Sequence, residues 1–566
     1  MQGSGGRILI EELVRHGIRR VFGVPGESYL DALDAMHGRN DIDFVICRQE
    51  GGAAMMAEAH GKLTGRPGVC FVTRGPGATN ASSGVHVAAQ DSTPMILLVG
   101  QIDSNARERE AFQEVDYRQM FGGMVKWVAE IEDARRIPEL VHRAMLTACS
   151  GRPGPVVLAL PENMLTEVVE TAPGRPCQAV HAFPDPAAVA TLQEWLAAAE
   201  RPLVILGGGG WNAQGIGDIR RFVEANDLAT AVVFRRQDYL DNTHPCYVGD
   251  IGIGPNPALV ERLNEADLVL VVGARLGEMT TNAYTLIGLP QPRQRMVQVL
   301  NGAEELGRVY QPDLLINASL PAMAATLAAL PPLASRPWAA STKAGHESYL
   351  RHIAPVAIPG DVQMPEVMAA MRERLPTDAI VTNGAGNYSA WCNRFYSYRA
   401  FRSQLAPTSG SMGYGLPAAI AARLEHPDRP VVCFAGDGCF LMTGQELATA
   451  CQYRLPIVIL VFNNGMYGTI RMHQEREYPE RIVGTALENP DFVRLAEAYG
   501  AKGALVEHTR DFAPAFDAAL AADRPTVIEI RMDPEAITPR QSLTQIREAA
   551  LARRDGQGPA APGGSR

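Results

Sequence analysis

Short, continuous runs of apolar residues alternate with longer amphipathic stretches along most of the chain. Continuous apolar runs of strand length between helices are typical of a parallel sheet that is covered on both faces. The pattern in the first third of the chain therefore predicts a doubly wound α/β fold. The predicted strands there are 44–47, 68–73 and 95–100, and the predicted helices are 8–16 and 51–63.

The same alternation occurs twice more, and stretches rich in proline and small residues at 171–186 and 330–341 separate the three units. A chain of 566 residues is too long for one hydrophobic core, so we expect three doubly wound parallel-sheet domains. Further strands are predicted at 204–206, 268–272, 379–382, 431–435, 457–462 and 526–530. The expected domains are an N-terminal domain at 1–170, a central domain at 187–335, a C-terminal domain at 362–540 and a partly disordered tail at 541–566.

Charge and cysteine content narrow the classes of function. The formal net charge of −10 argues against non-specific binding to nucleic acid or to a membrane surface. The nine cysteines form no CxxC pair, so neither a zinc site nor a redox dithiol is indicated, and such cysteines fit a reducing cytosol. The N-terminal segment lacks the apolar core of a signal peptide, and no apolar run is long enough to span a bilayer. We expect a cytoplasmic protein.

Polar motifs follow two neighbouring strands of the third predicted sheet. Gly436-Asp437-Gly438 comes directly after one strand, and Asn463-Asn464 follows the next. Between them, Thr443 and Glu446 have the spacing of a capping box, which predicts a helix at 444–453. Because the carboxyl ends of parallel strands lie at one edge of a sheet, where ligands bind, both motifs are placed at a candidate site.

The two motifs have the chemistry of a metal–diphosphate site. Glycine lets backbone N–H groups approach a diphosphate closely, and Asp437 and Asn464 carry oxygen atoms of the kind that Mg²⁺ prefers. Gly-Asp-Gly alone is most often a tight turn. Its occurrence with a second motif at the end of the next strand favours a binding site.

The run at 436–464, GDGCFLMTGQELATACQYRLPIVILVFNN, resembles the diphosphate- and metal-binding motif of the thiamine-diphosphate enzymes. The resemblance extends through VFGVPGESYLDAL at 21–33, TRGPGATNA at 73–81 and AFQEVD at 111–116, and is strongest to the large catalytic subunit of acetolactate synthase. It implies that Mg²⁺ binds Asp437, Asn464 and the backbone carbonyl of Met466. It implies that the residues around thiamine diphosphate are Gly386, Asn387, Tyr388, Gly410, Met412, Gly436, Asp437, Gly438, Cys439, Asn464 and Met466.

Glu50 follows the strand predicted at 44–47 and begins an Ala-rich helix. Taken alone, a glutamate in a first helical turn most often only favours the helix dipole. The resemblance implies a catalytic role, in which this carboxyl group hydrogen-bonds a ring nitrogen of the cofactor's aminopyrimidine and so favours removal of the thiazolium proton. Gln49 stands where the family usually has histidine.

The run TSGSMGYGLP at 408–417 precedes a predicted helix at 418–424 and, taken alone, is a flexible loop. The resemblance implies that Met412 wedges under the cofactor and bends it into a V, a role that suits a soft, unbranched side chain. It also implies that the carbonyl of Gly410 accepts the cofactor's amino group.

The substrate pocket is less well defined by the sequence. The resemblance implies that Phe112 and Gln113 border it, although Phe112 could equally be core and Gln113 surface. His473 stands where acetolactate synthases generally have a tryptophan. It is either an exposed helix residue or part of a polar acceptor pocket, in which an imidazole can act as a proton donor.

Two segments depart from the family pattern. Only Arg275 survives in the basic segment at 273–279, and Asn387-Tyr388 replaces a Gln-His pair that contacts diphosphate in the family. Acetolactate synthases often carry a non-redox FAD, and Gly207–Gly210 could cradle its phosphate. The run does not match a dinucleotide fingerprint, so we prefer a buried structural turn and do not expect FAD.

The resemblance implies decarboxylation of a 2-oxo acid such as pyruvate, followed by carboligation to a second carbonyl compound. One alternative is a 2-oxo-acid decarboxylase, or an aldehyde lyase or carboligase, of the same family; His473 and the altered 273–279 segment favour it. The other is a non-catalytic paralogue that binds the cofactor or regulates a partner. The presence of Glu50, Met412, Asp437 and Asn464 argues against it. The family's site forms between two subunits, which implies a homodimer or homotetramer and leaves open whether a regulatory subunit binds.

Overall fold

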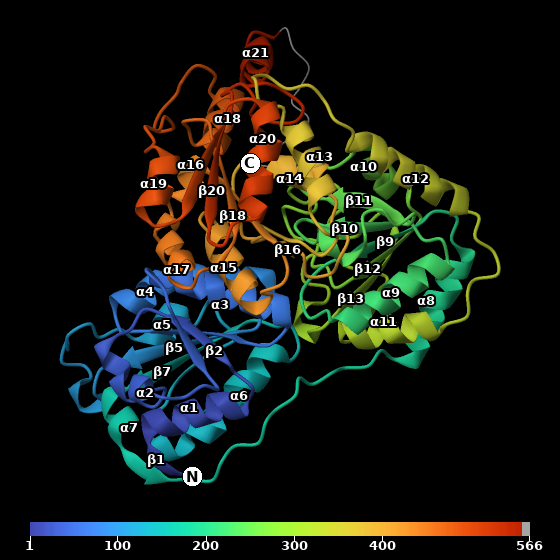
Figure 1. Ribbon diagram of the computed structural model, residues 1–566. Helices are drawn as coiled ribbons and strands as arrows, with labels where there is room; N and C mark the ends of the chain where they lie inside the picture. Colours follow the sequence, from blue (N-terminus) through green and yellow to red (C-terminus); the bar gives the residue numbers. More distant parts are fainter. Residues whose placement is uncertain (557–566) are drawn as a thin grey trace.

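The structure is a computed structural model in which residues 1–556 are described, and it contains three domains, each built on a six-stranded parallel sheet (Figure 1). Helices cover both faces of each sheet, which confirms the predicted fold class. A two-stranded antiparallel ribbon, β1 (Gln2–Ser4) and β8 (Val168–Glu170), joins the ends of the first domain.

The first sheet has the strand order β3-β2-β4-β5-β7-β6. Its strands are β2 (Arg20–Gly23), β3 (Asp43–Ile46), β4 (Gly68–Val72), β5 (Met95–Gln101), β6 (Trp127–Glu130) and β7 (Pro155–Pro161). Its helices are α1 (Gly5–Arg15), α2 (Leu30–Asp34), α3 (Glu50–Thr64), α4 (Pro76–Asp91), α5 (Tyr117–Phe121), α6 (Ile137–Cys149) and α7 (Glu162–Thr166). An extended segment at 171–185 then runs along the outside of the molecule to the central domain (Figure 1).

The central sheet has the order β11-β10-β9-β12-β13-β14. Its strands are β9 (Pro202–Leu206), β10 (Thr230–Val233), β11 (Tyr247–Ile251), β12 (Leu268–Val272), β13 (Arg295–Leu300) and β14 (Leu314–Asn317). Its helices are α8 (Pro186–Ala198), α9 (Ala213–Ala225), α10 (Pro257–Glu265), α11 (Leu320–Ala329) and α12 (Ala339–His352). The last three residues of the stretch at 330–341, expected to be a linker, are already helical in α12.

The third sheet has the order β16-β15-β17-β18-β20-β19. Its strands are β15 (Ile380–Asn383), β16 (Gln404–Leu405), β17 (Val431–Gly436), β18 (Val458–Asn463), β19 (Lys502–Val506) and β20 (Thr526–Arg531). Its helices are α13 (Met364–Arg374), α14 (Ser389–Phe395), α15 (Gly415–Glu425), α16 (Asp437–Phe440), α17 (Leu447–Gln452), α18 (Gly468–Glu477), α19 (Phe492–Ala498) and α20 (Thr509–Leu520). Single 3-10 turns occur at η1 (Glu27–Tyr29), η2 (Ser104–Ala106), η3 (Ala134–Arg136), η4 (Gln237–Tyr239), η5 (Ala303–Glu305) and η6 (Gly444–Glu446).

Part of the segment expected to be a tail is ordered. Helix α21 (Leu543–Arg554) begins with a capping box between Ser542 and Gln545 and packs on α18. Residues 557–566, the rest of that segment, lie outside the described residues. No helix in the described part of the chain is both long and apolar enough to cross a membrane.

The helix predicted at 444–453 forms as two pieces, η6 and α17, and its predicted capping box is wrong. The Thr443 hydroxyl donates instead to the carbonyl of Gly413, with 2.6 Å between the oxygen atoms. The carboxylate of Glu446 accepts from the backbone N–H groups of Arg48 and Gln49. Both side chains are engaged by distant partners, so neither is free to cap the local turn.

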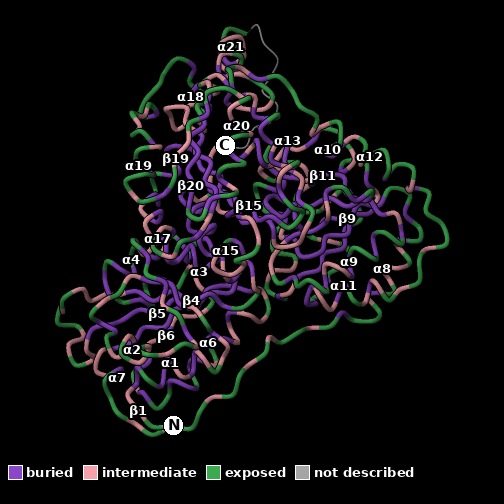
Figure 2. Tube along the Cα trace, viewed as in Figure 1, coloured by how far each residue is buried: buried purple, intermediate pink, exposed green. Residues whose placement is uncertain are grey.

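The central strands of the sheets are buried along most of their length (Figure 2). Alternate residues of such a strand belong to different core clusters. In β18, for example, Ile459 and Val461 belong to one core cluster, whereas Leu460 and Phe462 belong to another. This explains the continuous apolar runs from which the strands were predicted. The first of these clusters also crosses between domains, because α3 packs on α15 through small residues of both helices (Figure 1).

Candidate active site

A cavity of about 250 Å³ lies at the carboxyl edge of the third sheet. The segments that follow β15, β16, β17 and β18 form much of its wall. All eleven residues expected around the cofactor line it: Gly386, Asn387, Tyr388, Gly410, Met412, Gly436, Asp437, Gly438, Cys439, Asn464 and Met466. Four separate segments of sequence therefore meet at one cavity.

Asp437 is buried directly after β17 and is held by hydrogen-bond donors. Its Oδ1 atom accepts from the N–H of Gly438 at 2.8 Å, and its Oδ2 atom accepts from the N–H of Gly465 at 2.9 Å and from Nδ2 of Asn489 at 2.8 Å. Burial raises the pKa of Asp437 above its ordinary value, although these hydrogen bonds oppose the shift. None of the ion pairs among residues 1–556 includes this carboxylate, so it is a buried anion that a cation would stabilise.

The turn after β18 carries the other two expected metal ligands. The side-chain oxygen of Asn464 accepts a hydrogen bond from the N–H of Met466 at 3.3 Å. Met466 also forms a bridge with Ala486, which fixes the backbone of this turn. The turn thus presents Asn464 and Met466 to the same cavity as Asp437.

The loop at 406–414 connects β16 to α15 and carries Gly410 and Met412. Gly410 has φ of 67°, a left-handed conformation that favours glycine, and open space lies where a Cβ atom would be. Met412 is partly buried against the core of the third domain. The loop is anchored beyond Met412, because the N–H of Gly413 donates to the sulfur of Cys439 at 3.2 Å.

Hydrogen bonds and close contacts hold Asn387 and Tyr388 in the wall of the same cavity. Nδ2 of Asn387 donates to the carbonyl of Ile537 at 3.0 Å, and its Oδ1 accepts from the hydroxyl of Thr469 at 2.9 Å. The hydroxyl of Tyr388 lies 3.1 Å from the sulfur of Cys439. Burial raises the pKa of the Tyr388 phenol well above its ordinary value, so it stays neutral at physiological pH.

Glu50 does not line this cavity. It begins α3 at the carboxyl edge of the first sheet, and its Oε2 accepts a hydrogen bond from Nδ2 of Asn80 in α4 at 2.9 Å. A Cβ atom at Gly77 would lie 3.5 Å from its other oxygen, so the glycine-rich start of α4 gives this carboxylate room. The chain therefore presents two separate sets of candidate residues, one on the first domain and one on the third.

Phe112 and Gln113 lie with the first-domain set rather than in the cavity. The Phe112 side chain is 72% exposed, so the interpretation as core is wrong. Gln113 has φ of 66° and packs its Cβ against Gly75, at the start of α4. The Phe112 carbonyl accepts from Nε of Arg74 at 3.2 Å.

His473 lies on the exposed side of α18, outside the cavity wall. Partial burial lowers the pKa of its imidazole, and the nearby charge of Arg476 adds to that shift. The first turn of α18 does contribute to the wall through Thr469 and Ile470. In the single chain the structure thus places His473 as a helix surface residue.

The structure adds residues that the sequence did not indicate. Asn80 and Asn489 each hydrogen-bond a candidate carboxylate. Asn80 falls in the TRGPGATNA run, which offered a signal, whereas Asn489 lies in a loop with no motif of its own. Further cavity residues are Ala385, Trp391, Phe462, Tyr467, Gly468, Thr469, Ile470, Met532, Ala536 and Ile537.

The glycines at 207–210 are explained by close packing. A Cβ atom at Gly208 would lie 2.0 Å from the carbonyl oxygen of Gly273, and one at Gly209 would lie 2.3 Å from that of Ser92. These contacts require glycine whether or not a phosphate binds. Nη2 of Arg275, on the next turn, donates to the carbonyl of Gln90 at 2.6 Å and so joins the central domain to the first.

The third-domain cavity has the donor set of a metal–diphosphate site: a buried carboxylate without a cationic partner, an amide, a backbone carbonyl and several glycines. The residues present therefore fit a diphosphate cofactor with a hard cation. Three parallel-sheet domains with such a site define the class of thiamine-diphosphate enzymes.

Comparison with known families agrees with this class. Models described as thiamine pyrophosphate enzyme match in three parts: the N-terminal TPP binding domain at residues 3–120, the central domain at 189–330 and the C-terminal TPP binding domain at 384–530. The chain belongs to the thiamine pyrophosphate enzyme family and is acetolactate synthase-like.

Similar curated proteins include large subunits of acetolactate synthase. The protein from Parasynechococcus marenigrum (strain WH8102) is 31% identical over 548 residues, which cover 94% of this chain and 87% of that protein. The protein from Lactococcus lactis subsp. lactis (strain IL1403) is 31% identical, and the alignment covers 93% of this chain and 92% of that protein. Isozyme 2 from Escherichia coli (strain K12) is 29% identical, and the alignment covers 94% of this chain and 96% of that protein.

Proposed function

We propose that this enzyme decarboxylates a 2-oxo acid, with pyruvate as the donor, and joins the remaining acyl unit to a second carbonyl compound, as acetolactate synthases do. The single observation that carries the proposal is the meeting of all eleven expected cofactor residues on one cavity wall. Thiamine diphosphate, when bound, supplies a carbon nucleophile and an electron sink for the leaving carboxyl group.

In this proposal the third domain holds the diphosphate end of the cofactor. Asp437, Asn464 and the carbonyl of Met466 would hold Mg²⁺, which would neutralise the buried charge of Asp437. Gly410 and Met412 line the same cavity, where the Gly410 carbonyl would accept the cofactor's amino group and the Met412 side chain would support its bend. FAD forms no part of the proposal, since packing explains Gly207–Gly210.

The first domain supplies the proton chemistry. Glu50 holds a proton at the ring nitrogen of the aminopyrimidine, and Asn80 orients its carboxylate through the hydrogen bond at 2.9 Å. Because Glu50 lies outside the cavity of its own chain, the complete site combines the first domain of one copy with the third domain of another. We therefore propose a homodimer as the minimum unit, with a tetramer built from such dimers.

The proposed compartment is the cytoplasm. All nine cysteines are free thiols, and six of them are buried, as expected in a reducing environment. The buried thiols pack in the cores and form no disulfide bonds. The proposal would be contradicted by fractionation that recovers the protein outside the cytoplasm.

The test is steady-state turnover of the purified protein with pyruvate, with and without thiamine diphosphate and Mg²⁺, and with products identified by mass spectrometry. Cofactor-dependent formation of 2-acetolactate is the expected result. Acetaldehyde as the sole product would instead identify a decarboxylase. Absence of pyruvate turnover by cofactor-loaded protein would contradict the choice of donor and direct the search to other 2-oxo acids and aldehydes.

A further inference from the structure

A buried charged cluster from the first domain holds the loop that carries Gly410 and Met412. Asp91, at the end of α4, has a fully buried side chain and accepts hydrogen bonds from both the N–H and the hydroxyl of Thr408; the nitrogen lies 2.8 Å from its Oδ1. Thr408 is two residues from Gly410. The contact therefore acts on the backbone just before the cofactor-facing residues.

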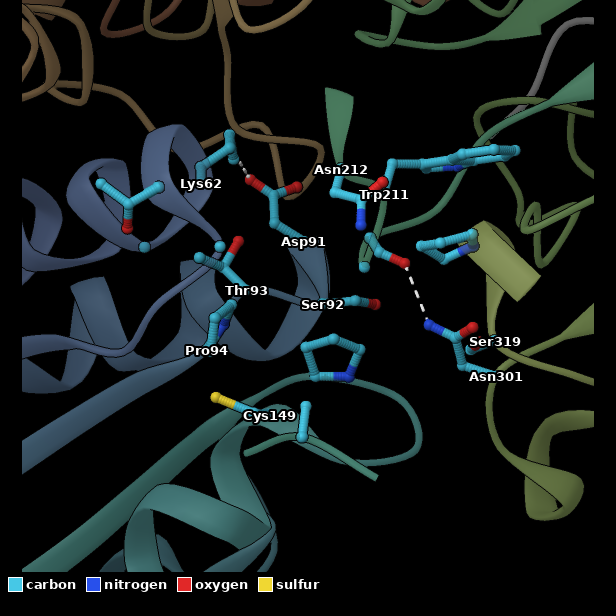
Figure 3. Close-up of a pocket in the computed structure, with 18 of the residues that line it drawn as sticks. Lys62, Asp91, Ser92, Thr93, Pro94, Cys149, Trp211, Asn212, Asn301 and Ser319 are labelled. Carbon is cyan, nitrogen blue, oxygen red and sulfur yellow. Dashed lines mark hydrogen bonds and ion pairs between the residues drawn. The ribbon is translucent and has the colours of Figure 1, made fainter. Parts of the chain in front are cut away.

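Lys62 in α3 completes the anchor. Its Nζ atom donates to Oδ2 of Asp91 at 2.5 Å and to the carbonyl of Ala406 at 3.2 Å. Figure 3 shows Lys62 and Asp91 joined in this way on the wall of a cavity of about 420 Å³, to which all three domains contribute. One ion pair thus touches the loop at two positions.

The far end of the same loop is also held by α3. The hydroxyl of Tyr414 donates to Oε2 of Glu58 at 2.5 Å, and Nζ of Lys62 lies 3.2 Å from the other oxygen of Glu58. Glu58, like Tyr414, is fully buried. Helix α3 of the first domain therefore hydrogen-bonds the loop both before Gly410, at Ala406, and after Met412, at Tyr414.

The charges in the cluster are balanced. Burial alone would raise the pKa of Asp91, but Lys62 and the central domain's Arg236 hold it below its ordinary value, helped by the hydrogen bonds from Lys62 and Thr408. Nη2 of Arg236 also donates to the backbone carbonyl of Asp91 at 3.1 Å. Asp91 is thus a charged anchor at the meeting point of three domains.

We propose that Asp91 and Lys62 are positioning residues, which fix the loop at 406–414 so that Gly410 and Met412 meet the cofactor rings. The inference rests on the proposed function. It gives the first domain two roles. Glu50 contributes to the cofactor site of another copy, whereas Asp91 and Lys62 hold the loop that lines the cavity of their own chain. Neither residue lines the third-domain cavity, so they act through the loop.

The test removes one hydroxyl with little change of shape. Thr408→Val deletes the side-chain hydrogen bond to Asp91, and Thr408→Ser restores a hydroxyl. Thr342→Val in α12 is the matched control, since its buried hydroxyl donates to the carbonyl of Asp227, within the central domain. The readouts are the dissociation constant of thiamine diphosphate at saturating Mg²⁺, kcat and KM for pyruvate, and the melting temperature of the cofactor-free protein.

We expect Thr408→Val to weaken thiamine-diphosphate binding by about tenfold, the effect of losing a hydrogen bond to a charged group. We expect kcat to fall and KM for pyruvate to hold, with Thr408→Ser close to the wild type. Thr342→Val should lower the melting temperature without changing cofactor affinity. Unchanged cofactor affinity and kcat in a folded Thr408→Val protein would overturn the inference.

Asp91→Asn provides a second route if Thr408→Val does not fold. Its amide oxygen can still accept from Thr408 but it no longer balances Lys62, so weaker cofactor binding is expected and wild-type affinity would overturn the inference. Wild-type protein that fails to bind thiamine diphosphate would overturn the proposed function together with this inference. Normal wild-type binding and turnover, with unaffected variants, would overturn the inference alone.

Discussion

The carboxylate of Glu446 in the third domain accepts a hydrogen bond from the backbone N–H of Gln49 in the first, with 2.9 Å between Oε1 and the nitrogen. The same oxygen accepts from the N–H of Arg48 at 3.0 Å, and the other oxygen accepts from the hydroxyl of Thr449 at 2.7 Å. Glu446 is fully buried. Its side chain therefore fixes the two residues that precede Glu50.

Removal of this acceptor should destabilise the protein and disturb Glu50. In Glu446→Ala, two backbone N–H groups and one hydroxyl lose their partner, which costs about 2–4 kcal/mol. We expect a fall of about 2–3 °C in melting temperature, together with lower turnover. Glu446→Gln keeps one acceptor oxygen, so its melting temperature should lie between those of the wild type and Glu446→Ala. An unchanged melting temperature in Glu446→Ala would show that this contact does not stabilise the domain junction.

Glu50→Gln tests the proposed proton chemistry. The amide has nearly the same shape, so the cofactor should still bind, but it cannot share a proton with the aminopyrimidine. We expect kcat to fall by about 100-fold or more, the usual contribution of a positioned acid or base. Glu110→Gln, an exposed residue of the same domain, is the control and should leave kcat unchanged. Wild-type turnover by Glu50→Gln would refute its assignment.

Asp437→Asn should separate stability from binding. Because burial raises the pKa of Asp437, its charge is unfavourable in the cofactor-free protein, and the neutral amide removes that cost. The amide also replaces one acceptor oxygen with a donor, so we expect only a small net change in melting temperature without cofactor. Adding thiamine diphosphate and Mg²⁺ at 100 times the dissociation constant should stabilise the wild type by about 2.7 kcal/mol. The variant should show no such shift. Calorimetric scans with and without cofactor measure both effects, and an equal shift in the variant would contradict the metal assignment.

The sequence was sufficient for the features that depend on local pattern. Buried strands such as β12 and β18 are continuous apolar runs, and the placement of Asp437 and Asn464 at one edge follows from the strands being parallel. Recognition of the loop at 408–417 required the resemblance to a family, because its composition alone indicates only flexibility.

The features that depend on distant partners were not predictable. Thr443 and Glu446 have capping-box spacing, yet their side chains bond to Gly413 and to Gln49, almost 400 residues away in the second case. Asn489 lies in a loop without a motif and reaches Asp437 only through the tertiary fold. The separation of Glu50 from the cavity likewise follows from how the first and third domains pack.

A pH dependence of stability is expected from Asp250, near the end of β11. Burial raises its pKa to about 7, although a hydrogen bond from the Gln237 side chain at 3.2 Å opposes the shift. The folded protein holds this proton more tightly than the unfolded chain, so the stabilisation is complete below about pH 4 and is lost as the pH rises towards 7. Asp250→Asn should therefore have a smaller fall in melting temperature between pH 5 and pH 8.

Thermal scans across this range measure the effect, with Glu261→Gln on the exposed side of α10 as the control. The control should follow the wild-type curve. Other groups titrate in the same range, but they are common to the wild type and Asp250→Asn, so the difference between their curves isolates this carboxyl group. Parallel curves for these two proteins would show that Asp250 does not carry a raised pKa.

A shared site between copies can be tested by mixing two inactive variants. Glu50→Gln is defective in the first-domain set and Asp437→Asn in the third-domain set. In a mixed dimer with shared sites, one site receives both defects and the other receives the intact Glu50 and the intact Asp437. Random exchange of equal amounts gives half mixed dimers, so about one quarter of wild-type activity should return.

Sites formed within single chains would give no recovery, because every chain then carries one defect. Subunit exchange is verified by tagging one variant and recovering the other with it. A mixture of Glu50→Gln with Glu446→Ala, both of which act on the first-domain set, is the control and should not gain activity beyond that of its components. Recovery near one quarter would establish that Glu50 serves the cavity of another copy, and absence of recovery despite verified exchange would rule it out.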